Sequence, residues 1–200
     1  SFWVDSKMIQ DPVNLHTITL AEAIQKSSQV AIAKVALDLP RDAVFDVLKR
    51  SGLGDYVGTG LPGEVTGLFS NVGMQSRVSR TAMAYGYGFT VTPLQLASAY
   101  VALAGHGSRL PLSILKQDRV PEPQQVFDAD DSREVIAMME RVTQQGGTAT
   151  NADIDDYRVA GKTGTARVLE NGRYNDERHV AWFAGLAPVS DPRIVMVVLV

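Results

Sequence analysis

The sequence predicts an α+β domain in which an antiparallel sheet is flanked by helices. Three extended runs lie near the end of the chain, at about residues 157–168, 179–187 and 194–200. Short turns join them, at Asn171-Gly172 and at 190–193, and sequential strands with short connections pair antiparallel. The preceding residues show the apolar spacing and capping signals of helices. Helices packed on one antiparallel sheet belong to the α+β class.

The first helices are predicted on either side of a polar corner. Thr19 and Glu22 have the spacing of a capping box, in which each side chain satisfies a free N–H at the helix start. A second helix is predicted before Pro40 from apolar residues at helical spacing, namely Val30, Ala33, Ala36 and Leu37. Ser27-Ser28-Gln29 lies between the two. On its own this segment is better explained as a polar helix–helix junction than as a functional site.

Four more helices are predicted before the sheet. They cover about 41–50, 76–84, 92–105 and 130–145. The third begins at a second capping box and has a proline at its first position, where no N–H is needed. The fourth places its apolar side chains on one face, namely Val135, Met138, Met139 and Val142. Residues 51–75 are rich in glycine and are predicted to be irregular.

The first strand carries the run Lys162-Thr163-Gly164-Thr165. Side chains alternate along a strand, so Lys162 and Gly164 should share one face and Thr163 and Thr165 the other. Gly164 leaves room for a ligand backbone. An edge strand of this kind could receive an acyl or peptide substrate and direct a cation and a hydroxyl at its carboxylate.

Phosphate binding is the main alternative for this run. Gly161-Lys162-Thr163 matches the end of a P-loop, but that motif needs a glycine five residues before Gly161. Asp156 occupies that position, and a hairpin follows where a P-loop needs a helix. The nucleotide interpretation is therefore rejected.

Composition excludes several other classes. A formal charge of −3 gives no reason to expect a nucleic-acid partner. The chain has no cysteine, which excludes a thiol nucleophile and a disulfide framework. Its three histidines lack metal-ligand spacing. We predict no metal and no cofactor.

Three segments occur in an order that points to a known family. They are Lys26-Ser27-Ser28-Gln29-Val30, the block from Tyr85-Gly86-Tyr87-Gly88 to Thr92-Pro93-Leu94-Gln95-Leu96-Ala97, and Lys162-Thr163-Gly164-Thr165-Ala166. With them the chain resembles the transpeptidase domain of a class B penicillin-binding protein, most closely the division-type enzymes. The resemblance covers nearly all 200 residues. It implies part of the fold shared by penicillin-binding proteins and serine β-lactamases.

The resemblance implies serine acyl transfer, which needs an activated hydroxyl, a proton route and an oxyanion hole. The family uses Ser-x-x-Lys, Ser-x-Asn and Lys-Thr/Ser-Gly motifs. Ser27 would relay a proton between the nucleophile, its lysine and the leaving amine. Lys162 would supply positive charge beside Ser27, and Thr165 would contact the substrate carboxylate and contribute an oxyanion-hole N–H. Gln29, Thr163 and Gly164 would bind the substrate.

Two departures from the family pattern stand out. Gln29 replaces the family's asparagine and is one methylene longer. No Ser-x-x-Lys precedes Ser27, and the one present, Ser113 to Lys116, lies after it in a segment that reads as strand and loop. The chain also lacks an initiator methionine and a signal peptide. We therefore expect residues 1–200 to be a partial transpeptidase domain that lacks the upstream nucleophile segment and the C-terminal end.

The resemblance further implies peptidoglycan stem peptides as substrates, β-lactams bound through a serine outside this chain, and division-complex proteins as partners. The location would be the periplasmic face of the inner membrane, with an anchor upstream. Two alternatives remain: a serine β-lactamase or β-lactam sensor domain, and a non-catalytic scaffold. The first should lack the 86–97 block in this form. A Ser-x-x-Lys opening a helix in the upstream gene sequence would argue against the second.

Overall fold

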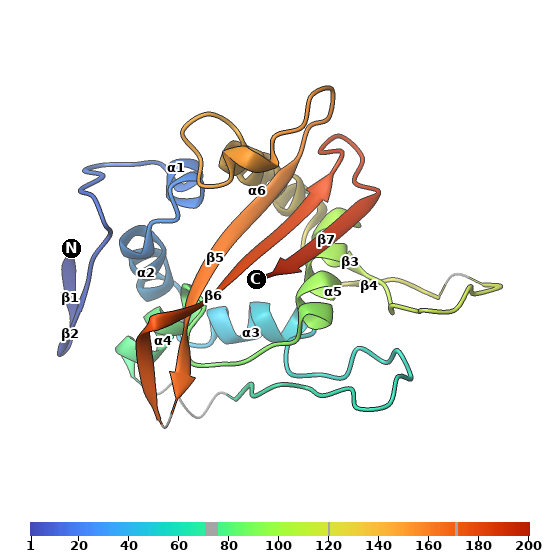
Figure 1. The fold of residues 1–200 in the computed structure, drawn as a ribbon, viewed down its shortest axis with the longest axis horizontal. Helices are drawn as coiled ribbons and strands as arrows, with labels where there is room; N and C mark the ends of the chain where they lie inside the picture. The colour runs from blue at the N-terminus through green and yellow to red at the C-terminus, as the bar shows by residue number, and fades with distance from the viewer. Residues whose placement is uncertain (71–75, 120, 171) are drawn as a thin grey trace.

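A computed structural model describes residues 1–70, 76–119, 121–170 and 172–200 (Figure 1). The helices are α1 (Leu20–Gln25), α2 (Gln29–Asp38), α3 (Ala43–Arg50), α4 (Arg77–Ala84), α5 (Pro93–Ala104), α6 (Ala129–Thr143) and a short 3-10 helix, η2 (Thr150–Ala152). The strands are β1 (Phe2–Val4), β2 (Lys7–Ile9), β3 (Ser108–Arg109), β4 (Gln124–Gln125), β5 (Ala160–Glu170), β6 (Arg173–Ala187) and β7 (Ile194–Leu199).

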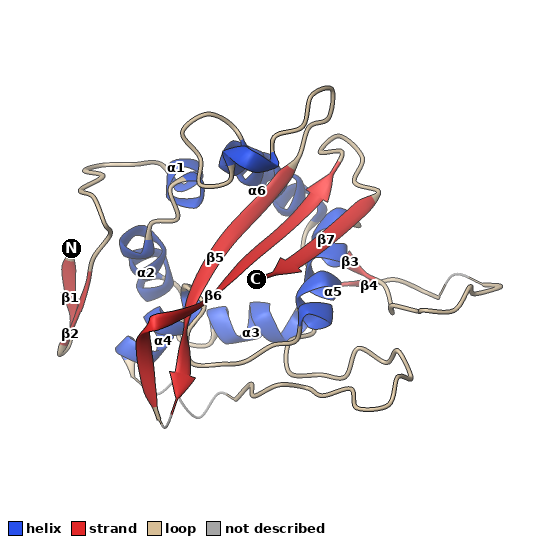
Figure 2. Ribbon diagram, viewed as in Figure 1, coloured by secondary structure: helices blue, strands red, loops and turns tan. Residues whose placement is uncertain are grey.

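The main sheet is the predicted antiparallel meander, in the order β5-β6-β7. β5 is an edge strand, as expected, with Lys162 opposite Ala184 of β6. The helices lie behind and beside the sheet (Figure 2). The arrangement confirms the predicted α+β class.

The strand boundaries differ from the prediction at two places. β5 begins at Ala160 because Tyr157 forms a local bridge with Ile154 instead. β6 begins at Arg173, well before 179, because its charged start pairs with the end of β5 beyond a bulge between Arg167 and Leu169. In the predicted Asn171-Gly172 turn, Gly172 has the required positive φ, 77°. Asn171 lies outside the described residues.

The core has two parts. In one, α6 packs on the sheet through Ile136 and Met139, which meet Ala160 and Leu186. The other joins Val4 and Ile9 of the β1–β2 hairpin to α2. The sequence did not predict this hairpin, because strands of three residues are too short to show a period. The second core holds the N-terminal segment against the helix that follows Ser27-Ser28.

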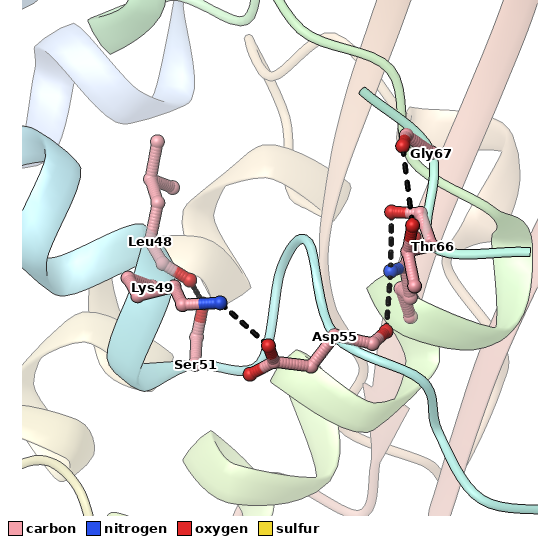
Figure 3. A network of polar contacts seen from close by, with 7 residues as sticks. Leu48, Lys49, Ser51, Asp55, Thr66 and Gly67 are labelled. Carbon is pink, nitrogen blue, oxygen red and sulfur yellow. Dashed lines mark hydrogen bonds and ion pairs between the residues drawn. The ribbon is translucent and has the colours of Figure 1, made fainter. Parts of the chain in front are cut away.

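Both predicted capping boxes form, and the second also anchors the irregular segment after α3. Gln95 is almost fully buried, and its Nε2 donates to the carbonyls of Asp55 (2.8 Å) and Thr66 (2.9 Å). Figure 3 shows Asp55 and Thr66 on this segment, where the Asp55 carboxylate also meets Lys49 of α3 at 2.5 Å. Among the helices of the described ranges, none combines the length and hydrophobicity needed to cross a bilayer.

Candidate active site

Ser27 lies at the corner where α1 ends and α2 begins, and its backbone is left-handed, with φ 56°. The Ser27 N–H donates to Ile24 O (3.2 Å), and the Ser28 N–H donates to Ala23 O (2.9 Å). This bond pair is the Schellman motif that ends many helices, and glycine usually occupies its left-handed position. A serine there carries a backbone cost that a glycine would avoid.

Ser28 begins α2 and is held by a residue that the sequence did not reveal. Its buried Oγ accepts from Ala31 N (3.0 Å) and donates to Asp11 Oδ2 (2.6 Å). The other oxygen of Asp11 accepts from Val30 N (3.2 Å). A carboxylate is favourable at a helix N-terminus, where N–H groups lack partners. Asp11 lies 17 positions before Ser28, outside any local motif.

Lys162 and Ser27 meet as predicted, although 135 positions separate them. Lys162 Nζ donates to Ser27 Oγ at 2.7 Å and to the carbonyl of Thr163 at 2.8 Å. Burial disfavours the charged ammonium and lowers the pKa of Lys162 from 10.5 to about 8. The structure thus places a hydroxyl and a partly desolvated lysine in direct contact between a helix corner and an edge strand.

The neighbours of Lys162 on β5 make different contacts, as strand alternation predicts. Thr163 Oγ1 lies 2.7 Å from Thr148 Oγ1, away from Ser27. Thr165 is exposed and pairs in register with Ala181. A Cβ added at Gly164 would meet nothing closer than Trp182 Cβ at 3.9 Å. The described chain therefore does not itself require glycine at this position.

Gln29 borders a cleft beside the corner. It is the first residue of α2 and is exposed. Together with Asp11, Tyr85, Tyr87 and Arg167 it lines a cleft of about 430 Å³. The Gly-Tyr-Gly segment after α4 therefore contributes to a wall near β5. Gln29 can reach a ligand that lies in this cleft along the edge strand.

Ser113 is not placed as a nucleophile, in agreement with the sequence prediction. It lies in an exposed loop, where its Oγ accepts from Leu115 N (3.1 Å) and donates to Leu115 O (2.7 Å). No helix begins there. Within the described residues, no cluster of three or more His, Cys, Asp or Glu side chains could hold a metal ion.

Comparison with known proteins shows the family to which the chain belongs. Residues 3–200 match the family described as "Penicillin binding protein transpeptidase domain". The chain belongs to this family. It is 40% identical over 198 residues to "Peptidoglycan D,D-transpeptidase FtsI" of Escherichia coli K12, which covers 98% of this chain and 34% of that protein. It is 40% identical to "Probable peptidoglycan D,D-transpeptidase PenA" of Neisseria gonorrhoeae, over 88% of this chain and 30% of that protein.

A solved structure confirms the predicted fold. The transpeptidase domain of Burkholderia pseudomallei penicillin-binding protein 3, in its apo form, matches with a TM-score of 0.94 at 35% identity. The match covers 100% of this chain and 61% of that one. The resemblance to division-type penicillin-binding proteins is thereby confirmed. The chain spans about a third of the length of the curated relatives that it matches.

Proposed function

We propose that the protein containing this chain is a peptidoglycan D,D-transpeptidase that acts on D-Ala-D-Ala stem peptides through a serine acyl-enzyme. The observation that carries the proposal is the 2.7 Å contact between Lys162 Nζ and Ser27 Oγ. Proton transfer needs groups within about 2.6–3.2 Å of each other. The names of the relatives from Escherichia coli and Neisseria gonorrhoeae support the same reaction.

In the proposed reaction, a serine from a segment outside this chain attacks the carbonyl of the penultimate D-Ala. Its Oγ–C bond forms, and backbone N–H groups, including that of Thr165, stabilise the oxyanion. The C–N bond to the last D-Ala then breaks, and Ser27 gives a proton to the leaving amine. The proton lost by the nucleophile returns through its own lysine to Ser27. An acceptor amine then attacks the acyl carbon, so that a C–N bond forms and the Oγ–C bond breaks. The amine gives up a proton, and the serine oxygen regains one.

Lys162 has two roles in this scheme. Because the pKa of Lys162 is about 8, this side chain is charged in about ten of every eleven molecules at pH 7. The ammonium keeps the Ser27 oxygen oriented and favours a substrate carboxylate on β5. Thr163, Gly164 and Thr165 would lie along that carboxylate and the acyl chain, and Gln29 would contact the substrate from the cleft.

The finer roles follow from the same proposal. We assign the enzyme to septal peptidoglycan cross-linking at the periplasmic face of the inner membrane, together with other division proteins. β-Lactams imitate the D-Ala-D-Ala end and would acylate the same serine. The sequence motif for that serine is not found before Ser27, so we place it in the part of the protein that precedes residue 1.

Intact-mass measurement after incubation with penicillin tests the proposal. We expect a penicilloyl adduct on the complete protein and none on residues 1–200 alone. Ser27→Ala in the complete protein should slow the adduct's formation. A complete protein that never forms the adduct would indicate the scaffold instead, whereas rapid release of hydrolysed penicillin would indicate a β-lactamase. An adduct on residues 1–200 would show that a serine of this chain is the nucleophile.

A further inference from the structure

The loop at residues 144–149, here called the brace loop, joins α6 to η2 and has a fixed shape. The Gly147 N–H donates to Gln144 O (2.9 Å), and Ala149 N donates to Val142 O (2.9 Å). A Cβ added at Gly147 would lie 2.0 Å from Val142 O, so only glycine fits. Gly146 has a left-handed backbone, with φ 83°. The loop therefore leaves α6 along one defined path.

One side of the brace loop holds the corner that carries Ser27. Lys26 Nζ donates to Gly146 O at 2.6 Å, and Gln25 Nε2 donates to Gln145 O at 3.4 Å. Lys26 directly precedes Ser27, at the end of α1. A lysine side chain loses rotamer freedom in such a contact. The contact links the residue before Ser27 to a loop that is 120 positions away in the sequence.

The other side of the brace loop holds β5. Thr148 Oγ1 lies 2.7 Å from Thr163 Oγ1, and Thr163 directly follows Lys162. The loop thus contacts the residue before Ser27 and the residue after Lys162. Ser27 and Lys162 touch each other through a single hydrogen bond at 2.7 Å. A fixed third segment bonded to both neighbours would define that distance more firmly than the single bond.

We propose that Lys26 is a positioning residue for the Ser27–Lys162 pair and acts through the brace loop. This inference rests on the proposed function. Without the Lys26 donor, the corner would keep the Schellman bonds, the contacts with Asp11 and the long Gln25–Gln145 bond at 3.4 Å. Its position relative to β5 would nevertheless loosen, because the 2.6 Å bond to Gly146 is lost. Displacements on the scale of 1 Å between reacting groups can reduce rates by about a hundredfold. The chemical step should suffer, whereas ligand capture along β5 should change little.

The test uses the complete enzyme and stopped-flow acylation by penicillin, which separates the acylation rate constant from the dissociation constant of the first complex. Lys26→Met keeps most of the side-chain length and removes the donor. We expect its acylation rate constant to fall by about ten- to a hundredfold, with the dissociation constant within about twofold of wild type. Lys26→Arg keeps a donor and should restore most of the rate.

Lys34→Met is the matched control. Lys34 is an exposed lysine on α2 that lies over the Phe2 ring at 5.6 Å and makes no contact with the brace loop. Its rate should equal that of wild type. Melting temperatures check that each variant is folded. Should Lys26→Met not fold, Lys26→Ala takes its place with the same expected loss.

A double-mutant cycle tests whether the brace loop is the connection. Thr148→Val removes the contact with Thr163, with Thr150→Val in η2 as its control. Groups that act through one element have non-additive effects. The double variant should therefore lose less than the product of the two single losses. Full rate in Lys26→Met, no rescue by arginine, or losses that multiply would each overturn the inference. A wild-type enzyme that is not acylated would instead overturn the proposed function.

Discussion

At the scale of single residues, Ser27 combines a strained backbone position with a hydroxyl that the proposed function requires. Its φ of 56° places it where a Schellman motif normally has glycine. A side chain costs about 1–2 kcal/mol in this conformation. Sequences retain such costs where function needs the side chain. Substitutions of Ser27 can therefore show how a residue affects stability and activity in opposite ways.

Ser27→Gly should leave the complete protein more stable than Ser27→Ala does, and both changes should slow acyl transfer. Relief of the left-handed strain, about 1–2 kcal/mol, exceeds the cost of a more flexible unfolded chain, about 0.4–1 kcal/mol. Both Ser27→Gly and Ser27→Ala lose the hydrogen bond from Lys162. The free energy of unfolding of Ser27→Gly should therefore exceed that of Ser27→Ala by about 0.5–1 kcal/mol, measured by urea denaturation. Ser27→Ala removes the same hydroxyl but keeps the Cβ, so it should bring no such gain. Equal stability of the two variants would contradict the account of the strain.

Lys162 should make the dissociation constant of a penicillin depend on pH near pH 8. Above its pKa of about 8 the lysine is neutral and attracts a carboxylate less. The dissociation constant of a penicillin should therefore rise with pH through this value. A penicillin ester without the carboxylate charge should show no such rise, and an identical rise for the ester would exclude Lys162 as the cause.

Lys162 also affects folding stability. Penicillin binding should weaken as pH rises, whereas the contribution of Lys162 to stability should increase. The unfolded chain holds the Lys162 proton up to about pH 10.5, whereas the folded chain releases it near pH 8. The unfolded state thus binds more protons between these values, and the free energy of unfolding contributed by Lys162 should rise with pH across that window. Lys162→Met should remove this rise, as urea titrations at several pH values would reveal.

Gln29→Asn should speed acylation by β-lactams that carry an acylamino side chain. The longer glutamine displaces its amide by about one methylene, and misplacement on that scale can cost up to about a hundredfold in rate. A β-lactam that lacks the group should gain much less, because it offers no polar partner. Stopped-flow acylation of both forms with both ligands provides the comparison. Faster acylation of the Gln29 form would mean that the cleft accommodates the longer side chain.

At the scale of elements, the best predicted features were those formed by residues close together in the sequence. Thr19 with Glu22, and Thr92 with Gln95, lie within one helical turn, so their capping boxes could be predicted from spacing alone. Gly172 likewise adopts the backbone that its turn requires. The β1–β2 hairpin could not be predicted, because its strands are too short to show alternation.

In the candidate site, too, local features could be predicted from the sequence, whereas long-range contacts could not. Strand alternation indicated that Lys162 and Thr163 face different partners, but only the family resemblance paired Lys162 with Ser27. Asp11 and Lys26 make side-chain contacts across 17 and 120 positions. Single aspartates and lysines carry no spacing signal, so such contacts become visible only when the chain is folded.

Gln95→Leu should destabilise the complete protein by about 2–3 kcal/mol. The change removes the amide that bonds Asp55 O, Thr66 O and Thr92 N, and leaves these backbone groups without that partner in the interior. Thermal or urea unfolding measures the loss. Gln117→Leu, in an exposed loop, is the matched control and should stay within about 0.5 kcal/mol of wild type. A similar small effect at Gln95 would mean that the segment after α3 does not depend on this anchor.

At the scale of the whole molecule, the sheet has two edges with different surroundings. β5 faces the helix corner and the cleft, where the proposed function places the substrate. β7 forms the other edge, and within the described residues its only strand partner is β6. Figure 1 shows the sheet in front of the helices, so the outer face of β7 is turned away from them. Along that face Ile194, Met196 and Val198 are 60%, 55% and 40% exposed.

Along its outer edge β7 has no strand partner within the described part of the chain. An exposed apolar edge strand of this kind is a surface that promotes aggregation. Residues 1–200 produced alone should accordingly self-associate as their concentration is raised, with light scattering as the measurement. Met196→Lys places a charge in the middle of this strand and should suppress this association, while the melting temperature changes little because the side chain is exposed. A solution of residues 1–200 that stays monomeric at high concentration would show that this edge is already protected. If association is observed, the β7 edge, rather than the cleft, limits the concentration at which residues 1–200 can be purified.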